Sequence, residues 1–257
     1  MSHPFTHAIR QSVGQRDHQE DSADRFVIAG RAARPAELLT VIADGMGGHQ
    51  AGEKASSMAV KQFISHFKGS KNSEIKDRLA NSVVASNSAL SDEIVKAPET
   101  YGGMGTTLLA YATDGNDLAW VSVGDSPLLL FRDGVLSQLN EDHSMAPVIE
   151  EFIESGALPE EARYTHPHRN LLRSAISGGE IAAVDIREEV DFLQPGDVLI
   201  GCSDGLLTLD FEVIAEVIDQ LEYETAAEIC EALMEAVRLA NHPYQDNTTV
   251  AVILPKV

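Results

Sequence analysis

Cysteine and basic residues are scarce in this chain of 257 residues. Cys202 and Cys230 are its only cysteines, both lie in apolar stretches and they form no CxxC pair, so a reduced, cytoplasmic protein is expected. Only 19 lysines and arginines accompany 40 acidic residues, which gives a net charge of −21. Such an excess of negative charge argues against a nucleic-acid-binding or membrane-binding surface.

Long hydrophobic runs are missing as well. No apolar stretch approaches the length of a membrane span, and the N-terminal sequence MSHPFTHAIR lacks the charged start and apolar core of a signal peptide. No linker, internal repeat or low-complexity tract divides the chain, and 44% hydrophobic residues are enough for a sizeable core. We therefore expect a single, monomeric domain over residues 1–257.

The most informative stretch is LLTVIADGMGGHQAG at residues 38–52. Its apolar start, 38–43, predicts a buried strand that ends at Asp44, and the spacing over 51–67 predicts a helix. Gly45 and the next two glycines are expected to take positive φ and let the backbone approach a ligand. A single Asp-Gly after a strand usually marks only a turn, so the weight comes from the recurrence of the pattern.

Three other acids border predicted strands. Asp125 and Asp204 each follow one, and Asp246 precedes the last one. If the last strand runs antiparallel, these acids gather with Asp44 at one rim of a sheet. Carboxylates gathered without matching cations repel one another, and a bound cation removes the repulsion. Ligands that are all oxygen favour Mg²⁺ or Mn²⁺ over zinc.

A polar segment near the N-terminus, GQRDHQEDSAD, adds a second candidate feature. Arg16 is suited to gripping phosphate, because a guanidinium can meet two oxygens at once. Glu20 and Asp21 reach the acidic rim if their strand neighbours the one that ends at Asp44. A solvated turn explains the segment equally well.

The remaining pattern predicts short strands with helices early and late in the chain. Strands are expected at 8–13, 25–29, 106–112, 117–123, 128–132, 184–190, 198–202 and 248–254. Helices are expected at 74–97, 211–221 and 225–240, with short helical pieces at 147–156 and 159–163. This order favours a sandwich of sheets with helices outside each sheet. The HxH pair His166 and His168 fits a surface loop better than a metal site.

A serine hydrolase is a competing interpretation. Ser203 lies in a GxSxG pattern after a predicted strand, as a nucleophile elbow does, and His242 is the only histidine that follows it. The chain lacks regular alternation of strands and helices, however. The hydrolase interpretation also leaves Asp44, Asp125 and Asp246 unexplained.

Taken together, the motifs resemble the metal-dependent protein phosphatases, the type 2C serine/threonine family, in its compact bacterial form. The matching blocks, in order, are RDHQED, VIADGMGGHQAGE, GGMGTTLLA, VSVGDS, NEDHS, SDGLL and QDNTTVAVI, and they span residues 16–253. The resemblance implies an α+β fold, a four-layer αββα sandwich of two antiparallel sheets flanked by helices. It also implies a flap beside the active site at about 145–177, where substrates would be selected.

The resemblance further implies which residues bind metal. Asp44 would bridge two Mn²⁺ or Mg²⁺ ions, with the Gly45 carbonyl on one of them. Asp204 and Asp246 would bind the other ion. A metal-bound water or hydroxide would then hydrolyse phosphoserine and phosphothreonine proteins in one in-line step, without a phosphoenzyme.

Other roles follow from the same resemblance. Glu20 and Asp21 would hold waters bound to the ions, and Arg16 would clamp the phosphoryl oxygens. Asp125 would contribute to a third, weaker metal site. His49 is a hypothetical acid for the leaving seryl oxygen.

Four positions depart from the family pattern, Gln19, Met46, Pro127 and Thr208, and the last two bear on activity. Pro127 replaces an arginine that usually follows GDS, and Thr208 stands where an acid often supports the third metal. These departures leave open a catalytically weak member of the family that binds phosphoproteins without turnover.

Overall fold

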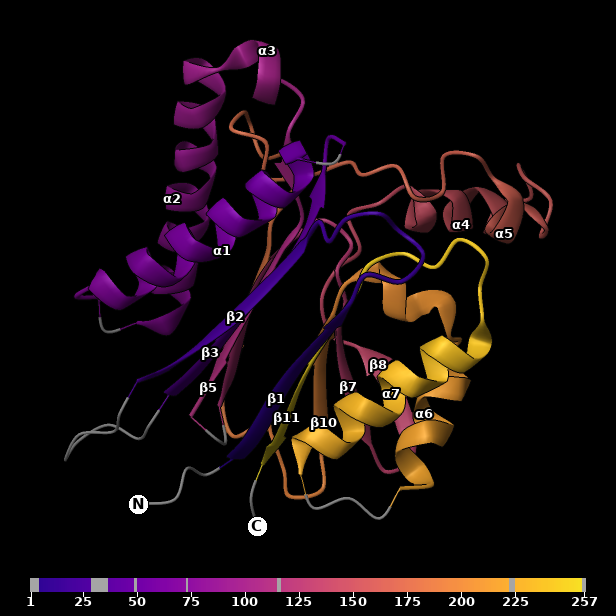
Figure 1. The fold of residues 1–257 in the computed structure, drawn as a ribbon. Coiled ribbons are helices and arrows are strands. Elements are labelled where there is room, and N and C mark those ends of the chain that lie inside the picture. Colours follow the sequence, from indigo (N-terminus) through magenta and orange to yellow (C-terminus); the bar gives the residue numbers. More distant parts are fainter. Residues whose placement is uncertain are drawn as a thin grey trace.

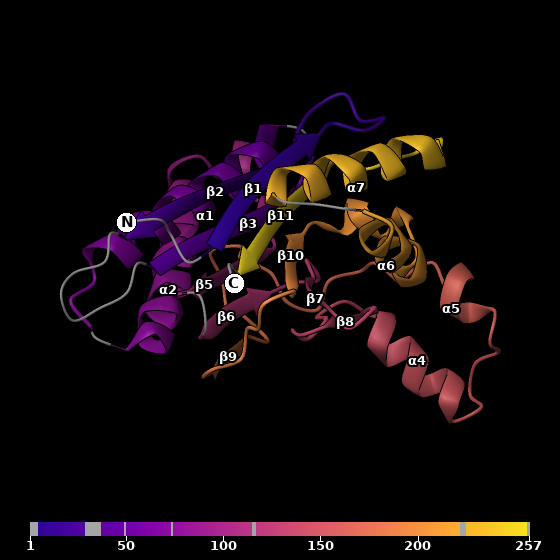
Figure 2. The same cartoon turned by 90° about the horizontal axis from the view of Figure 1, so that it is seen from below.

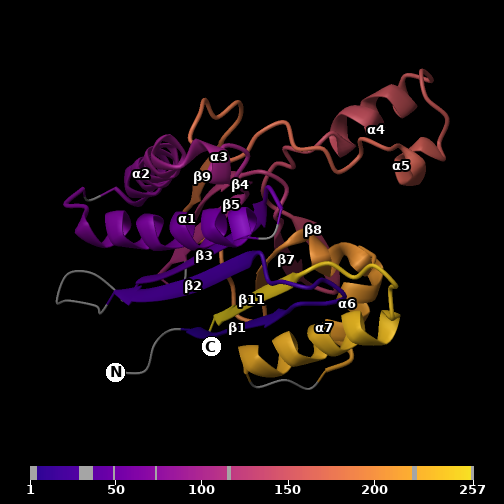
Figure 3. The same cartoon turned by 45° about the horizontal axis from the view of Figure 1, so that its top comes forward.

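The computed structural model describes residues 5–28, 37–48, 50–72, 74–114, 117–221 and 225–255. Within them, two antiparallel sheets pack face to face, and helices cover the outer face of each sheet (Figure 1). Figure 3 shows the layers in succession: α1 above β2 and β3, then β1 and β11, then α7. The predicted order of helix, sheet, sheet and helix is therefore confirmed.

The first sheet has five strands, and every pairing in it is antiparallel. Its spatial order is β1 (Phe5–Ser12), β11 (Thr248–Pro255), β10 (Val198–Cys202), β7 (Leu128–Arg132) and β8 (Val135–Gln138). The chain termini thus supply the neighbouring strands β1 and β11.

The second sheet is also antiparallel. Its spatial order is β2 (Asp21–Ile28), β3 (Glu37–Met46), β5 (Leu108–Thr113), β6 (Leu118–Val123) and β9 (Asp185–Glu189), and β4 (Gly105–Thr106) pairs with the end of β3. Because β2 pairs with β3, Asp21 lies directly opposite Asp44. The strand that begins at Asp21 is therefore the neighbour of the strand that carries Asp44, as the sequence analysis required.

The helices divide between the two outer faces (Figure 2). Helices α1 (Gln50–Gly69) and α2 (Ile75–Lys96) cover the second sheet, and α6 (Phe211–Asp219) and α7 (Ala226–Ala240) cover the first. Short helices α4 (Ala146–Glu154) and α5 (Ala162–Thr165) lie apart from both sheets in Figures 2 and 3. Two further short elements are α3 (Pro98–Tyr101) and the 3₁₀-helix η1 (Asp204–Thr208).

The burial of β3 explains why its sequence is continuously apolar. Leu38 and Ile42 point into the core between the two sheets, whereas Leu39 and Val41 point into the core beneath α1 and α2. A strand covered on both faces needs apolar residues at successive positions rather than at alternate ones. Burial of this strand fixes the position of Asp44 at its end.

Most predicted elements are present, with bounds shifted by a few residues. A hairpin turn at Asp133-Gly134 was expected, but no bounds were predicted for β8, whose side chains are exposed or half-buried, and the short turns α3 and η1 were not predicted. Among the described helices, none combines the length and the apolar character needed to cross a membrane.

Candidate active site

A cavity of about 720 Å³ lies where the predicted site residues meet. Those that line it are Arg16, Glu20, Asp44, Gly45, Asp125, Asp204 and Asp246. The expectation that the acids share the rim of one sheet was too simple. Asp44 and Asp125 come from ends of the second sheet, whereas Asp204 and Asp246 come from ends of β10 and β11 in the first. The cavity therefore needs both sheets.

The backbone of Asp44 is held on both sides by threonines. Its amide donates to Thr107 Oγ1 at 2.9 Å, and its carbonyl accepts from Thr107 N at 2.9 Å and from Thr106 Oγ1 at 2.8 Å. Thr107 Oγ1 also lies 2.8 Å from Ser126 Oγ, next to Asp125. These contacts fix the backbone of the acid at the end of β3 and link it to the turn that carries Asp125.

Gly45 is required for packing and not for an unusual backbone angle. A Cβ atom there would lie 2.2 Å from the carbonyl oxygen of Gly52 and 2.6 Å from that of Glu20. The prediction of a positive φ at Gly45 is wrong, whereas Gly47 and Gly48 do have positive φ, at 118° and 80°. Close packing at Gly45 brings α1, β3 and the segment that carries Glu20 together beside the cavity.

Asp21 is buried, is not among the described residues that line the cavity, and accepts two hydrogen bonds. Ser203 Oγ and Thr249 Oγ1 each donate to Asp21 Oδ2 at 2.7 Å. Ser203 is fully buried and its Oγ also accepts from Thr249 N at 2.9 Å. His242 lies in an exposed segment, where its Nδ1 accepts from Tyr244 N. This geometry does not support the alternative in which Ser203 is a nucleophile.

Burial and mutual repulsion disturb the acids of the site. Desolvation, followed by repulsion from neighbouring aspartates, raises the pKa of Asp44 well above its ordinary value. Desolvation and the charge of Asp204 raise the pKa of Asp125 to about 7. Asp21 is raised to a pKa of about 6, mainly by desolvation and against its two hydrogen bonds. The pKa of Asp204 is raised by burial and by Asp246.

These acids fit a divalent cation by their chemistry. Buried Oδ1 of Asp21 has no hydrogen-bond partner among the described residues, and the carboxylates that line the cavity, those of Glu20, Asp44, Asp125, Asp204 and Asp246, offer the oxygen ligands that such cations prefer. Within the same residues, no group of three or more His, Cys, Asp or Glu side chains is close enough to hold a metal ion as it stands. The two-metal assignment to Asp44, Gly45, Asp204 and Asp246 accordingly stays a prediction.

Arg16 is placed at the mouth of the cavity by a residue that sequence analysis missed. Asn247 is buried, its Oδ1 accepts from Glu20 N at 2.7 Å, and its Nδ2 donates to the carbonyls of Val13 and His18 at 2.9 and 3.0 Å. Arg16 Nη2 itself donates to Asp246 Oδ2 at 2.6 Å, and both side chains are partly exposed. The signal for Asn247 was its place beside Asp246 at the start of a strand.

Three other predictions are only partly addressed by the structure. His49, the hypothetical acid, lies outside the described residues. Thr208 is not among the described residues that line the cavity. His166 and His168 belong to the segment between α5 and β9, with their rings 5.7 Å apart, which agrees with the expected surface loop.

Comparison with known proteins identifies the family. The model of the family described as protein phosphatase 2C matches residues 15–241. The chain belongs to this family. The match includes Arg16 and three of the four acids that border the cavity from strand ends, Asp44, Asp125 and Asp204, whereas Asp246 lies five residues beyond its end.

Individual relatives agree with this assignment. The serine/threonine protein phosphatase PstP of Mycobacterium tuberculosis is 33% identical over 83% of the chain, and the chain spans 40% of that protein's length. A putative protein phosphatase 2C-type of Streptococcus pyogenes is 30% identical, with 96% of each chain covered. A crystal structure of the PstP catalytic domain with two manganese ions has a TM-score of 0.76 and 31% identity, and covers 98% of this chain and 99% of that one.

Proposed function

We propose that this member of the protein phosphatase 2C family is a metal-dependent enzyme that hydrolyses phosphoserine and phosphothreonine in proteins. The observation that carries the proposal is the set of desolvated, mutually repelling carboxylates around one cavity with a guanidinium at its mouth. Acids in this arrangement attract divalent cations, and the cations in turn attract a phosphate. The relationship to PstP supports the same reaction class.

Asp44, the Gly45 carbonyl, Asp204 and Asp246 are our candidates for holding two Mn²⁺ or Mg²⁺ ions, and Asp125 for a third, weaker one. The two manganese ions of the PstP catalytic domain support this choice. Bound ions of this kind supply an activated water as nucleophile and neutralise the charge of the phosphoryl group.

Residues of the chain itself prepare the cavity for the substrate. Arg16 exchanges its contact with Asp246 for the phosphoryl oxygens, which it can grip in pairs. Asp21, fixed by Ser203 and Thr249, presents its second oxygen without a protein partner among the described residues. Together with Glu20 it holds water in the site. We retain His49 as a hypothetical acid for the leaving oxygen.

The segment at about 145–177 is proposed to act as the flap that selects phosphoproteins, within a single catalytic domain over 1–257. Its end supports this role, because Asn170, Leu171, Leu172 and Arg173 line the cavity. A cytoplasmic, monomeric enzyme remains our expectation, and the two free, buried thiols are compatible with a reducing compartment.

The decisive experiment measures phosphate release from a phosphothreonine peptide by chelator-treated protein, with and without added Mn²⁺. A fluorophosphonate probe reports on Ser203 in parallel, and Ser203→Ala serves as the control for labelling. We expect release only with metal and no label on Ser203, because that hydroxyl is buried and bonded to Asp21. Absence of release with any divalent metal would favour a phosphoprotein-binding member without turnover, and a label on Ser203 would revive the hydrolase.

Replacing Arg16 with Ala is expected to weaken substrate binding more than it slows the reaction of the bound substrate. Loss of a bidentate, charge-assisted contact costs about 1.5–3 kcal/mol, so we expect KM for the peptide to rise about tenfold or more. Steady-state kinetics at saturating Mn²⁺ measures the change. Arg10→Ala is the matched control, because Arg10 also pairs with one acid, Glu231, but on β1 away from the cavity lining. An unchanged KM after Arg16→Ala would contradict the assigned contact.

A further inference from the structure

Residues 140–144 lie between β8 and α4 and are hydrogen-bonded to the turn that carries Asp125. Asn140 Oδ1 accepts from Leu128 N at 2.7 Å, and its Nδ2 donates to the Ser126 carbonyl at 3.1 Å. Asn140 is buried, so both bonds are shielded from water. One side of the Asp125 turn, defined as residues 124–127, is thereby fixed.

His143 is hydrogen-bonded to the other side of the same turn, at Gly124. The His143 amide donates to the Gly124 carbonyl at 3.1 Å, and the His143 ring Nδ1 accepts from the Gly124 amide at 3.2 Å. A ring nitrogen that accepts a bond from an amide carries no proton, so the other nitrogen, Nε2, holds it. Nε2 lies 4.0 Å from the carboxylate of Glu141. The side chain of His143 is buried, with 3% of its surface exposed.

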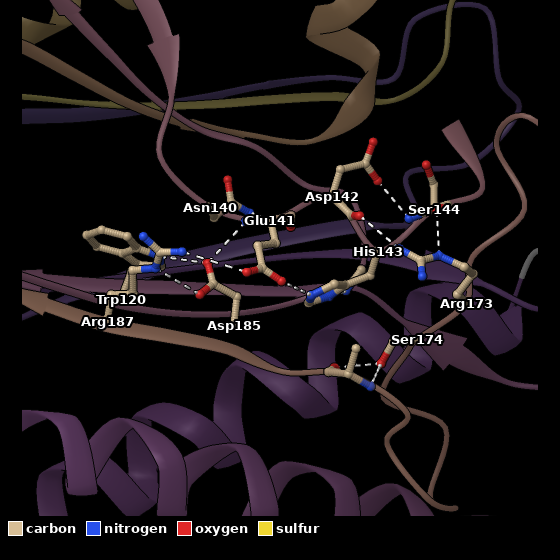
Figure 4. Close-up of polar contacts among 12 residues, drawn as sticks. Trp120, Asn140, Glu141, Asp142, His143, Ser144, Arg173, Ser174, Asp185 and Arg187 are labelled. Atoms are coloured by element: carbon tan, nitrogen blue, oxygen red, sulfur yellow. Dashed lines mark hydrogen bonds and ion pairs between the residues drawn. The ribbon is translucent and has the colours of Figure 1, made fainter. Parts of the chain in front are cut away.

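The same residue is also hydrogen-bonded to the last part of the flap. The His143 carbonyl accepts from Arg173 N at 2.8 Å, and the Arg173 side chain donates to the Ser144 carbonyl at 2.7 Å and to the Asp142 carbonyl at 3.4 Å (Figure 4). Next to it, Met145 N donates to the Leu171 carbonyl at 2.9 Å. Residues 140–145, which lead into the flap, and residues 171–176 near its end are therefore joined, and together they are called the flap base.

A polar cluster beside β6 and β9 holds this flap base in place. Asp185 Oδ2 accepts from Trp120 Nε1 at 3.0 Å and from Glu141 N at 3.1 Å, and Arg187 pairs with both acids (Figure 4). Asp185 and Trp120 are buried. The flap base thus has a fixed anchor in the second sheet, and His143 lies between that anchor and the Asp125 turn.

We propose that His143 is a positioning residue that joins the flap base to the Asp125 turn, so that the two segments open and close together. Each of its three bonds goes to one of these segments, and removal of the ring leaves the buried Gly124 amide without its acceptor. A phosphoprotein that displaces the flap would in this way also move Asp125. This consequence for Asp125 rests on the proposed function, whereas the structural coupling does not.

Hydrogen exchange of the chelator-treated protein tests the coupling without any catalysis. In His143→Leu we expect peptides from 120–128 and from 170–177 both to exchange roughly tenfold faster, because the buried Gly124 amide loses its acceptor. His143→Asn should restore slow exchange, since the asparagine oxygen is as many bonds from the backbone as Nδ1. His168→Leu, in the exposed part of the flap, is the matched control and should leave both peptides unchanged.

A second variant tests the coupling from the opposite side. Arg173 is exposed, so Arg173→Met should fold normally and loosen the flap base. If the coupling exists, exchange in 120–128 also rises in this variant. Faster exchange in only one of the two peptides, in either variant, or no rescue by His143→Asn, would overturn the proposal.

Activity provides a separate measurement. If Asp125 takes part in metal binding, His143→Leu should need several-fold more Mn²⁺ for half-maximal phosphate release, and His143→Asn should behave like the unmodified protein. An unchanged Mn²⁺ requirement together with coupled exchange would overturn only the consequence for Asp125. If the unmodified protein shows no activity with any metal, the proposed function fails while the exchange result still decides the coupling.

Discussion

Asp44→Asn is expected to abolish phosphate release and, at the same time, to stabilise the metal-free protein. Asp44 is desolvated and repelled by Asp21, Asp204 and Asp125, which raises its pKa. An amide of the same shape removes the repulsion, and we expect a gain of about 1 kcal/mol or more, or about 2–4 °C in Tm. The amide is also a poorer ligand for a hard cation. We therefore expect turnover to fall on the order of 10³-fold or more.

Two measurements on the same variant check this trade between stability and function. Thermal unfolding is followed in chelator and again with excess Mn²⁺, and phosphate release is measured at saturating Mn²⁺. Asp24→Asn on β2 is the matched control, because it makes the same change of charge at an exposed position beside the same strand. Full turnover in Asp44→Asn would contradict the metal assignment. A lower Tm in chelator would contradict the repulsion argument.

The sequence predicted those parts of the site that depend on local pattern. A continuous apolar run identified β3 and placed Asp44 at its end, because a strand buried on both faces has a distinctive composition. The acids next to β6, β10 and β11 were found by the same reasoning. The motifs also led to the correct family, since several modest blocks in one order are jointly specific.

Residues that organise the site from a distance escaped prediction. Asn247 accepts a hydrogen bond from the amide of Glu20, which lies 227 positions away in the sequence. Thr107 accepts one from the amide of Asp44, which lies 63 positions away. Neither residue belongs to a type that chemistry alone would select, and their roles depend on strand pairings between distant segments. Gly45 was selected for the wrong reason, because crowding by Gly52 and Glu20 is a property of packing and leaves no trace in the local sequence.

The stability of the metal-free protein is expected to fall as pH rises from about 4 to about 7. Burial raises the pKa of Asp21 from 3.8 to about 6 and that of Asp125 from 3.8 to about 7. In this range the native state therefore binds more protons than the unfolded state, and ∂ΔG/∂pH for unfolding is negative. Asp21 alone corresponds to about 3 kcal/mol across the range, because one pKa unit is worth about 1.4 kcal/mol.

Urea unfolding of chelator-treated protein between pH 4 and pH 7 measures this dependence, and Asp21→Asn identifies its source. The substitution should remove part of the slope, since an amide does not titrate, while the hydrogen bonds from Ser203 and Thr249 still find an acceptor. Excess Mn²⁺ should reverse the trend, because cations bind the ionised carboxylates and stabilise the native state more strongly at higher pH. Stability that rises with pH in chelator would contradict the burial of uncompensated acids. If metal left the pH dependence unchanged, these acids would not be the groups that bind the cation.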